Sequence, residues 1–460
     1  MSDTSRTPTA AILTLGCKLN IADSEAMARR LRDAGWAVVD RAAPGADAVI
    51  VNTCSVTHVA DQKSRHLVRM ARRMAPDATV AVTGCLLETS PSEKVDAMGA
   101  DLVYRQPEQV ALAERLIELR GAPALTPALS QGERGQARER LEASGDVADG
   151  SLSLAAHRPE AREGGKAPGA YRTRAFISAQ EGCNDVCAFC IIPKTRGRER
   201  SKTVAWVVEE ARKREAEGVQ EIVITGTQLG HYGSDNGVRL YDLMKALLTE
   251  TSIPRIRMSS VQPQDLDDDL IGLWDDSRLC RHYHLALQSG SEGVLGRMRR
   301  RYTKDEYRSA VRRLRASIPK IAITTDVIAG FPGETDGEFE ECYAFCEEMA
   351  FAGIHVFPYS QRPGTVAYRM AEQAPEPVKK QRVHRLIDLA RRMSSEYRRG
   401  FEGTTPLVLW ETRRDGDRWE GLTDTYVRVR AHSMAALANR ITPARIAGFS
   451  EDGLMGEVTA

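Results

Sequence analysis

Residues 180–193 read QEGCNDVCAFCIIP and place Cys183, Cys187 and Cys190 in a C-x3-C-x2-C spacing. Structural zinc sites and electron-transfer iron-sulfur sites normally use four protein ligands. Three thiolates on one short loop therefore indicate a cluster with one iron left open for a substrate or cofactor. A zinc site whose fourth ligand lies elsewhere, or three unrelated buried thiols, are the alternatives.

A second set of three cysteines lies in the first hundred residues and consists of Cys17, Cys54 and Cys85. Each cysteine follows an apolar run that predicts a strand, in the segments AILTLGC (11–17), AVIVNTC (48–54) and TVAVTGC (79–85). The carboxyl ends of parallel strands meet at one edge of a sheet, where open α/β sheets bind their ligands. We expect the three thiols to converge there and to hold a second cluster. Three buried structural cysteines are the alternative reading.

The composition is that of a globular protein, with 42% hydrophobic and 28% charged residues. No apolar run approaches the roughly 18 residues needed to cross a bilayer. The first residues, MSDTSRTPTA, carry an acidic residue and a proline where a secretory signal needs a basic start and an apolar core. Nine cysteines, an odd number, favour a reducing compartment over a disulfide framework. We therefore expect a cytoplasmic protein with no membrane partner.

The chain divides into four segments of different pattern. Residues 1–120 alternate apolar runs with helical patterns and predict a Rossmann-like parallel sheet. Residues 121–170 hold no Phe, Tyr, Trp, Ile, Met or Cys and predict a flexible linker or insertion. Residues 171–398 resume the β/α alternation and predict an α/β fold of partial (β/α)6 barrel type. Residues 399–460 hold the short alternating runs expected of a small antiparallel β-barrel.

The predicted strands of the (β/α)6 region end in small and polar residues. An active site is expected at the carboxyl ends of such strands. The residues at these ends are Cys183 to Cys190 after the first strand, Thr225 and Gly226 after the second, Ser259 and Ser260 after the third, Gln288 after the fourth and Asp326 near the end of the fifth.

These motifs resemble the radical S-adenosylmethionine (radical SAM) methylthiotransferases over nearly the whole chain outside residues 121–170. The C-x3-C-x2-C run resembles the radical SAM signature, and TLGCKLN (14–20) with VNTCSVT (51–57) resembles the amino-terminal domain of this family. Three further segments are most similar to the branch that modifies N6-threonylcarbamoyladenosine in tRNA, namely HLALQSGS (284–291), ITTDVIAGFPGE (323–334) and HVFPYS (355–360).

The resemblance implies two 4Fe-4S clusters and S-adenosylmethionine as cofactors. Cys183, Cys187 and Cys190 would hold the cluster that chelates S-adenosylmethionine, and Cys17, Cys54 and Cys85 would hold an auxiliary cluster. By the same resemblance, Thr225 and Gly226 would support the amino group of S-adenosylmethionine, and Ser259, Ser260 and Gln288 would lie nearer its ribose or carboxylate.

The reaction implied by the resemblance adds a methylthio group to C2 of the modified adenosine next to the anticodon. The C2–H bond is unactivated and no side-chain base can deprotonate it, so a cofactor must supply radical chemistry. The implied partners are the anticodon stem-loop of tRNA, a low-potential electron donor such as flavodoxin or ferredoxin, and a sulfur source. In this family the last domain is a TRAM domain, which binds RNA.

The charge pattern bears on RNA binding only locally, because the net charge is +1. The basic stretches 297–315 and 379–399 are consistent with phosphate contacts or with solvated helix faces. Tyr426, Arg428 and Arg430 alternate with valines, which predicts a basic face with an aromatic residue on the last domain. A solvated barrel face has nearly the same pattern.

Two segments depart from the family's pattern and two other functions stay open. Leu86-Leu-Glu88 follows Cys85 where Ala-Gln is more usual, and Tyr104-Arg-Gln106 replaces a Gly-Asn pair. These changes leave the cysteines in place and alter the contacts beside them. The nearer alternative is the same chemistry on isopentenyladenosine in tRNA or on an aspartate of a ribosomal protein. The more distant one is a non-catalytic metal-binding or redox-sensing protein that binds RNA.

Overall fold

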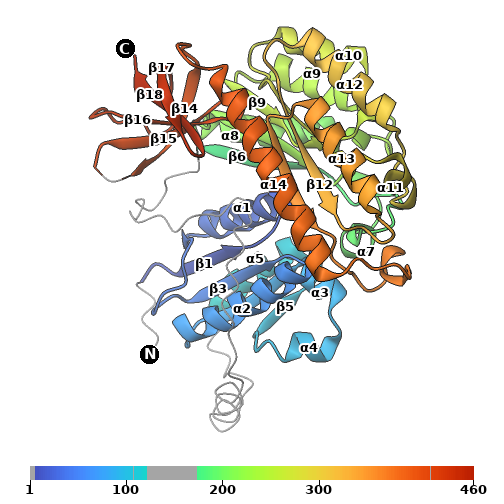
Figure 1. Cartoon of the computed structure of the whole chain (residues 1–460). Coiled ribbons are helices and arrows are strands. Elements are labelled where there is room, and N and C mark those ends of the chain that lie inside the picture. The colour runs from blue at the N-terminus through green and yellow to red at the C-terminus, as the bar shows by residue number, and fades with distance from the viewer. Residues whose placement is uncertain (1–5, 107, 122–172, 415, 460) are drawn as a thin grey trace.

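The computed structural model describes residues 6–106, 108–121, 173–414 and 416–459. The predicted linker at 121–170 lies outside these residues, apart from Gly121 at the end of a helix. An amino-terminal α/β domain, a partial β/α barrel and a small closed barrel follow one another along the chain and pack together (Figure 1). None of the described helices is long and apolar enough to span a membrane.

The amino-terminal domain is built on a parallel sheet in the order β2-β1-β3-β4-β5, which confirms the Rossmann-like prediction. The short edge strand β2 has no counterpart among the predicted strands. The elements are β1 (Thr9–Thr14), α1 (Lys18–Asp33), β2 (Ala37–Val39), β3 (Ala48–Thr53), α2 (His58–Met74), β4 (Thr79–Gly84), α3 (Cys85–Thr89), α4 (Ser92–Asp96), β5 (Leu102–Tyr104) and α5 (Gln109–Gly121).

Helices cover both faces of this sheet, which explains its continuous apolar strands. Alternate residues of a strand point to opposite faces. Ile50 in β3 packs with Met27 and Leu31 of α1 and with Leu112 of α5. Val49 and Val51 point the other way and pack with Val68 of α2 and with Leu86. The carboxyl end of the sheet is left for the cysteines.

The central domain is a partial barrel whose wall is formed by two sheets, β7-β6-β8-β9 and β10-β11-β12-β13. Strands β6, β8 and β9 are mutually parallel, as are β10 to β13, and β7 alone runs antiparallel to β6. The strands are β6 (Arg174–Glu181), β7 (Arg200–Ser201), β8 (Glu221–Gly226), β9 (Arg255–Met258), β10 (Ser260–Val261), β11 (His282–Leu285), β12 (Ala322–Ala329) and β13 (Gly353–Pro358).

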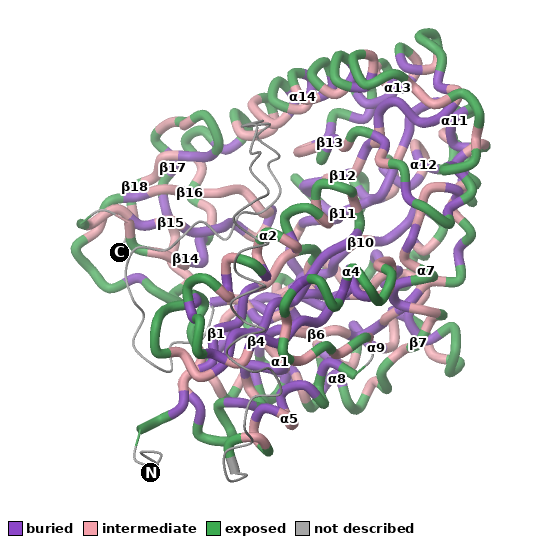
Figure 2. Tube along the Cα trace, turned by 90° about the horizontal axis from the view of Figure 1, so that it is seen from below, coloured by how far each residue is buried: buried purple, intermediate pink, exposed green. Residues whose placement is uncertain are grey.

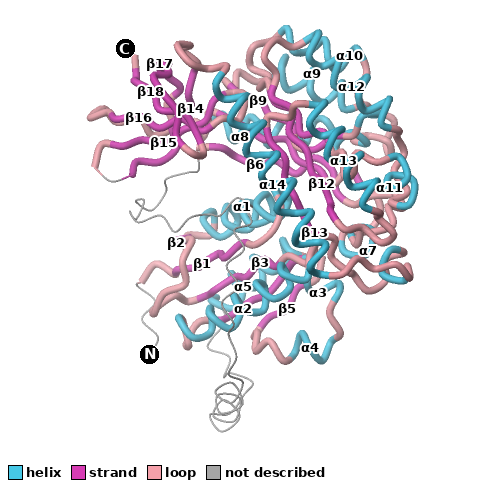
Figure 3. The backbone as a smooth tube through the Cα atoms, viewed as in Figure 1, coloured by secondary structure: helices cyan, strands magenta, loops and turns pink. Residues whose placement is uncertain are grey.

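Helices surround the outside of this wall, so the strands form the interior of the domain (Figure 3). Thr203 accepts a hydrogen bond from the backbone of Trp206 and caps the first long helix, α8. The helices are α7 (Ile192–Thr195), α8 (Val204–Ala216), α9 (Leu240–Glu250), α10 (Asp268–Gly272), α11 (Glu292–Arg297), α12 (Lys304–Ser317), α13 (Asp336–Met349) and α14 (Glu376–Arg399), with 3-10 turns η1 (Leu229–His231), η2 (Pro263–Asp265), η3 (Leu273–Asp275) and η4 (Ala367–Arg369).

The carboxyl-terminal domain is a closed barrel in the order β14-β15-β16-β18-β17. Its strand pairs are antiparallel, as predicted, except that β16 and β18 are parallel. Trp410 is fully buried at its centre and donates Nε1 to Thr442 at 2.8 Å. The strands are β14 (Leu407–Arg414), β15 (Arg418–Thr423), β16 (Arg428–His432), β17 (Ile441–Ser450) and β18 (Gly453–Val458).

Arginines at the amino ends of the central strands hold the closed barrel in place. Arg255 donates to the carbonyl oxygens of Leu422 at 2.9 Å and Leu407 at 2.8 Å. Arg281 bonds the carboxylate of Asp424 at 2.6 Å. The buried strands lie at the centre of the molecule and the exposed residues on its outer helices (Figure 2). The amino ends of the strands are thus closed by the last domain, which leaves the carboxyl ends for chemistry.

Candidate active site

Cys183, Cys187 and Cys190 lie on the loop that follows β6, at the carboxyl end of the central strands. The backbone N–H of Cys183 donates to the Gly197 carbonyl at 3.1 Å, and that of Cys190 donates to the Cys187 carbonyl at 3.1 Å. The loop leaves β6 at Gly182, where φ is +73° and a Cβ would collide with the Arg198 carbonyl. Only glycine fits this turn, so the loop is fixed by backbone geometry.

An arginine stands beside one of these thiols. Arg300 directs Nη1 to Cys187 Sγ at 3.2 Å and Nη2 to Gln262 Oε1 at 2.6 Å. Gln262 in turn donates Nε2 to Asp185, which lies inside the cysteine loop, at 3.0 Å. A guanidinium in this position stabilises a thiolate or an anionic cluster. Sequence reasoning missed this role, because Arg300 lies in a basic stretch that predicted phosphate contacts.

Cys17, Cys54 and Cys85 converge at the carboxyl edge of the amino-terminal sheet, as predicted. Cys17 is the residue before α1, Cys54 follows β3, and Cys85 begins α3. A Cβ on Gly16 would lie 3.1 Å from Cys54 Sγ. Gly84, at φ +100°, lies so close to the backbone of Thr53 that a Cβ would collide with the Thr53 carbonyl. Two glycines therefore let the three strand ends approach one another.

Buried amides align the first two cysteine segments. Asn20 donates Nδ2 to Asn52 Oδ1 at 3.2 Å and to the Thr53 carbonyl at 2.9 Å. Asn52 returns a hydrogen bond from Nδ2 to the Asn20 carbonyl at 2.9 Å. Both side chains are fully buried, so these bonds fix the start of α1 against the end of β3.

Burial favours the protonated form of four of the thiols, because it raises their pKa. It raises the pKa of Cys54, Cys183 and Cys190 to about 12. Burial likewise raises the pKa of Cys85. Metal ligands must be deprotonated, so loading either cysteine set would release protons.

Each cysteine set supplies three thiols, one fewer than the four protein ligands of a closed structural zinc site. Three thiolates suit an iron-sulfur cluster with one iron left open.

Arg196 joins the two cysteine sets. Its side chain is 1% exposed and donates to Asp23 Oδ2 at 3.0 Å and to Asn20 Oδ1 at 3.1 Å. Its charge also lowers the pKa of Cys85, against the larger effect of burial, which raises it. Arg196 caps α7, the helix that follows the first cysteine loop, and α7 lies against α3. The two cysteine sets therefore lie on facing edges of two domains.

The residues predicted to contact S-adenosylmethionine lie at the strand ends beside the cysteine loop. Thr225 donates Oγ1 to the Ile177 carbonyl at 3.3 Å, and Ser259 Oγ accepts from the Gly226 backbone at 3.3 Å. Ser260 begins β10. Gln288 has a φ of +67°. Its backbone N–H donates to the backbone carbonyl of Asp326 in β12 at 2.8 Å. The contacts of Thr225 and Ser259 shape the loops, and the assignment of ligand contacts to these residues stays a prediction.

Gln180 connects the cysteine loop to the loop after β8. Its Oε1 accepts from the Gln228 backbone at 2.9 Å, and its Nε2 donates to the Gly182 carbonyl at 2.9 Å. A Cβ on Gly226 would lie 2.9 Å from the same Oε1. Gly226 thus lets the two loops pack closely.

Three polar side chains, His284, Asp326 and His355, lie close together on the neighbouring strands β11, β12 and β13 of the central barrel. His284 directs Nε2 to Asp326 Oδ2 at 3.2 Å, and its ring lies 5.7 Å from that of His355. Burial by itself raises the pKa of Asp326, but His284, His355 and Lys18 outweigh it and hold the pKa below its ordinary value. Asp326 lies within β12, three residues before its end, close to the place near the strand end that the sequence predicts.

The aromatic residue expected on the RNA face of the last domain points elsewhere. Tyr426 precedes β16, in a turn with φ +67°, and stacks on His282 at 5.0 Å between ring centroids. Arg174 and Arg257 lie over the same ring at 5.6 and 4.8 Å. The alternation read from the sequence therefore fails at Tyr426, which closes the floor of the lumen. Arg430 is paired with Glu420 at 2.8 Å.

Most of the two basic stretches is neutralised within the fold. In residues 297–315, Arg297 pairs with Glu338 and Arg308 with Glu348. In residues 379–399, the partners lie on α13 and in the loop before it. The pairs are Arg382–Glu334, Arg385–Glu340 and Arg392–Glu347. These contacts favour packed and solvated helix faces over dedicated phosphate sites.

The two segments that depart from the family's pattern contact each other. Arg105 donates to the Leu87 carbonyl, and Glu88 accepts from the Gln106 backbone at 2.9 Å. The Arg105–Glu88 ion pair adds a contact at 3.7 Å. The residues that differ from the family's pattern therefore bond one another and link α3 to the segment after β5. Cys85 is still the first residue of α3.

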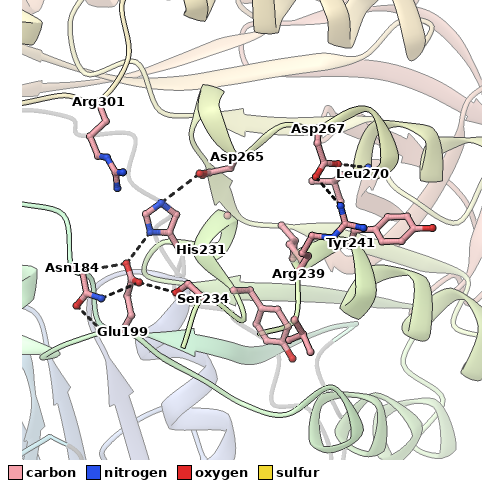
Figure 4. Close-up of a pocket in the computed structure, with 14 residues that line it drawn as sticks. Asn184, Glu199, His231, Ser234, Arg239, Tyr241, Asp265, Asp267, Leu270 and Arg301 are labelled. Carbon is pink, nitrogen blue, oxygen red and sulfur yellow. Dashed lines mark hydrogen bonds and ion pairs between the residues drawn. The ribbon is translucent and has the colours of Figure 1, made fainter. Parts of the chain in front are cut away.

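A separate pocket of about 560 Å³ is lined in part by Asn184, the residue after Cys183 (Figure 4). His231 lies between Glu199 at 2.8 Å and Asp265 at 3.6 Å. Burial raises the pKa of Asp265 to about 6. Asn184, the neighbour of Cys183, bonds Glu199 through its backbone at 3.1 Å. None of the predicted ligands lines this pocket, so the chemistry is better placed at the two cysteine sets.

Two family descriptions match the chain. Residues 177–346 match the Radical SAM superfamily, and residues 9–104 match a group described as uncharacterized protein family UPF0004. The chain is 35% identical to the threonylcarbamoyladenosine tRNA methylthiotransferase MtaB of Bacillus subtilis, covering 95% of this chain and 93% of that protein. It is 33% identical to the MtaB of Thermotoga maritima, covering 97% and 96%.

Relatives with another substrate name are nearly as similar. The tRNA-2-methylthio-N(6)-dimethylallyladenosine synthase of Acetivibrio thermocellus is 32% identical, covering 97% of this chain and 90% of that protein. Among solved structures, the radical S-adenosylmethionine methyltransferase TsrM of Kitasatospora setae aligns with a TM-score of 0.52 at 17% identity, covering 79% of this chain and 77% of that chain. That likeness bears on the fold alone.

Proposed function

The chain belongs to the radical SAM methylthiotransferases that act on tRNA, and we propose that it adds a methylthio group to C2 of N6-threonylcarbamoyladenosine next to the anticodon. The names of the similar MtaB proteins support this substrate. The observation that carries the proposal is the pair of cysteine sets on facing edges of two domains, joined by Arg196.

Cys183, Cys187 and Cys190 hold the cluster that chelates S-adenosylmethionine, and Cys17, Cys54 and Cys85 hold a second 4Fe-4S cluster. When bound, these groups supply a radical that removes the C2 hydrogen and a methylthio group that replaces it, which no protein side chain can do. The open valence of a three-cysteine site supports this assignment.

The chain's own residues bring the two sites together and set their charge. Arg300 places a cation 3.2 Å from Cys187 Sγ. Arg196 fixes Asp23 and Asn20 of the amino-terminal domain against the cysteine loop of the barrel. The target adenine would therefore move little between the site that removes its C2 hydrogen and the site that supplies the methylthio group. Holding both reacting groups close to one base lowers the entropic cost of the reaction.

The loops around β8, β9 and β11 are proposed to bind S-adenosylmethionine. Gly226 allows the β8 loop to pack on Gln180, Ser259 lies directly after β9, and Ser260 begins β10. Gln288 lies three residues after β11, in a left-handed conformation.

The target adenine is an unpaired base of the anticodon loop and would enter the active site from there. Such bases can be turned out of the loop at modest cost and inserted into a pocket. The closed barrel at the carboxyl terminus is proposed to bind tRNA as a TRAM domain. An electron donor such as flavodoxin or ferredoxin and a sulfur source complete the system.

The test is an anaerobic assay with the reconstituted protein, S-adenosylmethionine, dithionite and sulfide. Two tRNA transcripts carrying N6-threonylcarbamoyladenosine or N6-isopentenyladenosine would be compared by mass spectrometry of nucleosides. The proposal expects 2-methylthio product from the first substrate and 5'-deoxyadenosine formation. Product from the isopentenylated tRNA alone would move the assignment to that substrate, and no product with intact clusters would contradict the reaction.

A further inference from the structure

The cysteine loop after β6 is part of an exposed apolar face. Ala188 ties the loop to two other segments, because its backbone N–H donates to the Met298 carbonyl at 2.9 Å and its carbonyl accepts from the Ala367 N–H at 2.8 Å. The side chains of these three residues are buried in one small core. Residues beside Ala188 and Ala367 are exposed instead, and the exposed fractions are 69% for Val186, 40% for Val366 and 45% for Tyr368. Large hydrophobic side chains from two segments therefore lie around the same point of the surface.

Positive charges lie at the edge of this apolar face. Lys194 and Arg369 are exposed, and no ion pair joins either of them to a carboxylate of the described residues. A Cβ on Gly364 would collide with Lys194 Nζ, which places this ammonium group beside the segment before α14 (Figure 1). Arg301, whose side chain is 64% exposed, bonds Asp185 of the cysteine loop at 3.2 Å. The face is thus apolar at its centre and cationic at its edge.

The apolar face lies beside the cluster ligands. Val186 directly precedes Cys187, and Arg300, two residues after Met298, directs Nη1 to Cys187 Sγ at 3.2 Å. A protein that docks here comes close to the cluster, which matters for electron transfer because its rate falls steeply with distance. Weak electron-transfer complexes bury little surface, below about 1,200 Å² in total, and are steered by opposite charges.

The mixture of side chains favours a protein over RNA. Protein interfaces have an apolar centre and a polar rim, which is the arrangement of this face. An RNA strand would gain phosphate contacts from Lys194 and Arg369 but would leave the exposed valines without apolar partners. An exposed aromatic residue such as Tyr368 is the kind of side chain that anchors a protein interface.

We propose that this face docks an acidic one-electron donor protein of flavodoxin or ferredoxin type. Carboxylates of the donor meet Lys194, Arg301 and Arg369, and the apolar centre excludes water from the contact. The donor loses one electron and the cluster of the docked loop gains it, so no bond forms or breaks in this step. The inference rests on the cluster assignment of the proposed function and adds the place where the electron enters.

The test measures donor binding as well as electron transfer. The anaerobically reconstituted full-length protein would be titrated with flavodoxin, and separately with ferredoxin, by isothermal titration calorimetry at low salt. Lys194→Glu/Arg369→Glu should weaken donor binding about tenfold, and Tyr368→Ser at least about fivefold. In stopped-flow absorbance, reduction of the cluster by the reduced donor should slow by similar factors, whereas dithionite should reduce every variant at the wild-type rate. Added salt should weaken donor binding by the wild type more than by the double variant.

Matched controls lie on other helices. Lys245→Glu on α9 changes an exposed cation, and Trp206→Ser on α8 removes an aromatic side chain that is 43% exposed. Both should bind the donors as the wild type does. Iron content and circular dichroism of each variant establish that cluster loading and folding are intact.

Three results would overturn the docking face. The first is equal binding of both donors by the wild type and by Lys194→Glu/Arg369→Glu. The second is weaker binding of a fluorescein-labelled anticodon stem-loop by that double variant with donor binding unchanged, which would assign the face to RNA. The third is self-association of the wild type that Tyr368→Ser abolishes with donor binding unchanged, which would assign it to a second copy of the chain. Donor-dependent 5'-deoxyadenosine formation that is lost in the double variant, in an enzyme that makes no methylthio product, would keep the docking face and contradict the proposed function.

Discussion

Replacing Arg257 with methionine should loosen the carboxyl-terminal barrel from the floor of the central barrel. Arg257 is fully buried and bonds both carboxylate oxygens of Glu221, from Nε at 2.8 Å and from Nη2 at 3.2 Å. Its Nη1 donates to the Asp424 carbonyl at 2.9 Å, and its guanidinium lies 4.8 Å from the centre of the Tyr426 ring. One side chain thus neutralises a buried carboxylate and holds two domains together.

The magnitude follows from the burial of this pair. Unit charges about 4 Å apart attract by about 4 kcal/mol at an effective dielectric constant of about 20. Removing one partner of a buried pair costs about 3–5 kcal/mol, because the other charge is left without compensation. We therefore expect Arg257→Met to lower the free energy of unfolding by about 3–5 kcal/mol at pH 7.

The pH dependence of the wild type has a defined sign. Burial by itself raises the pKa of Glu221, but Arg257, Arg174 and Arg255 hold it below its ordinary value. The stabilisation is therefore fully present above the unfolded pKa of about 4.3 and is lost as the pH falls through the folded value. Arg257→Met should therefore be less stable than the wild type mainly at pH values above the pKa of Glu221. In acid, where Glu221 is protonated in both proteins, their free energies of unfolding should become similar.

Urea denaturation followed by tryptophan fluorescence would measure this effect, since Trp410 and Trp419 lie in the core of the carboxyl-terminal barrel. The double variant Arg257→Met/Glu221→Leu should regain at least about 2 kcal/mol, because no charge stays buried. Arg445→Met, which breaks an exposed pair with Glu457, should cost less than about 1 kcal/mol. A cost below about 1 kcal/mol for Arg257→Met, or a double variant as unstable as the sum of the single ones, would refute the reasoning.

Cys187→Ala should abolish cleavage of S-adenosylmethionine, whereas Cys54→Ala should leave 5'-deoxyadenosine formation and end sulfur insertion; methylthio product from Cys54→Ala would contradict the two-site assignment. Gly84→Ala should destabilise the amino-terminal domain by at least about 2 kcal/mol, because a Cβ at φ +100° meets the Thr53 carbonyl. Its iron content should fall from about eight atoms per chain to about four, while Gly99→Ala, with open space at φ +72°, keeps its iron. Arg300→Met should slow 5'-deoxyadenosine formation about tenfold, because it removes a charge-assisted bond to Cys187. The exposed Arg299→Met is its control, and equal rates in both variants would count against a role for Arg300.

The sequence predicted most parallel strands of the first two domains well because these strands are buried in the interior, behind covering helices. Parallel strands buried on both faces appear as continuous apolar runs, as in β3 and β8, and such runs are easy to find. The strand β2 was missed because it is three residues long and lies at the sheet edge. The cysteine sets were found because cluster chemistry demands this residue type at close spacing or at strand ends.

Contacts between distant segments were beyond the sequence. Arg300 is 113 residues from Cys187, and Arg196 is 176 from Asn20, so no spacing rule connects them. Tyr426 was misplaced because a left-handed turn before β16 is invisible in an alternating pattern.

The nucleosides of tRNA from cells with and without this gene test the central claim most directly. Liquid chromatography with mass spectrometry would compare the modified adenosines next to the anticodon. The account predicts that 2-methylthio-N6-threonylcarbamoyladenosine disappears without the gene and that N6-threonylcarbamoyladenosine accumulates in its place. An unchanged nucleoside profile, or loss of the methylthio group from isopentenyladenosine alone, would contradict it.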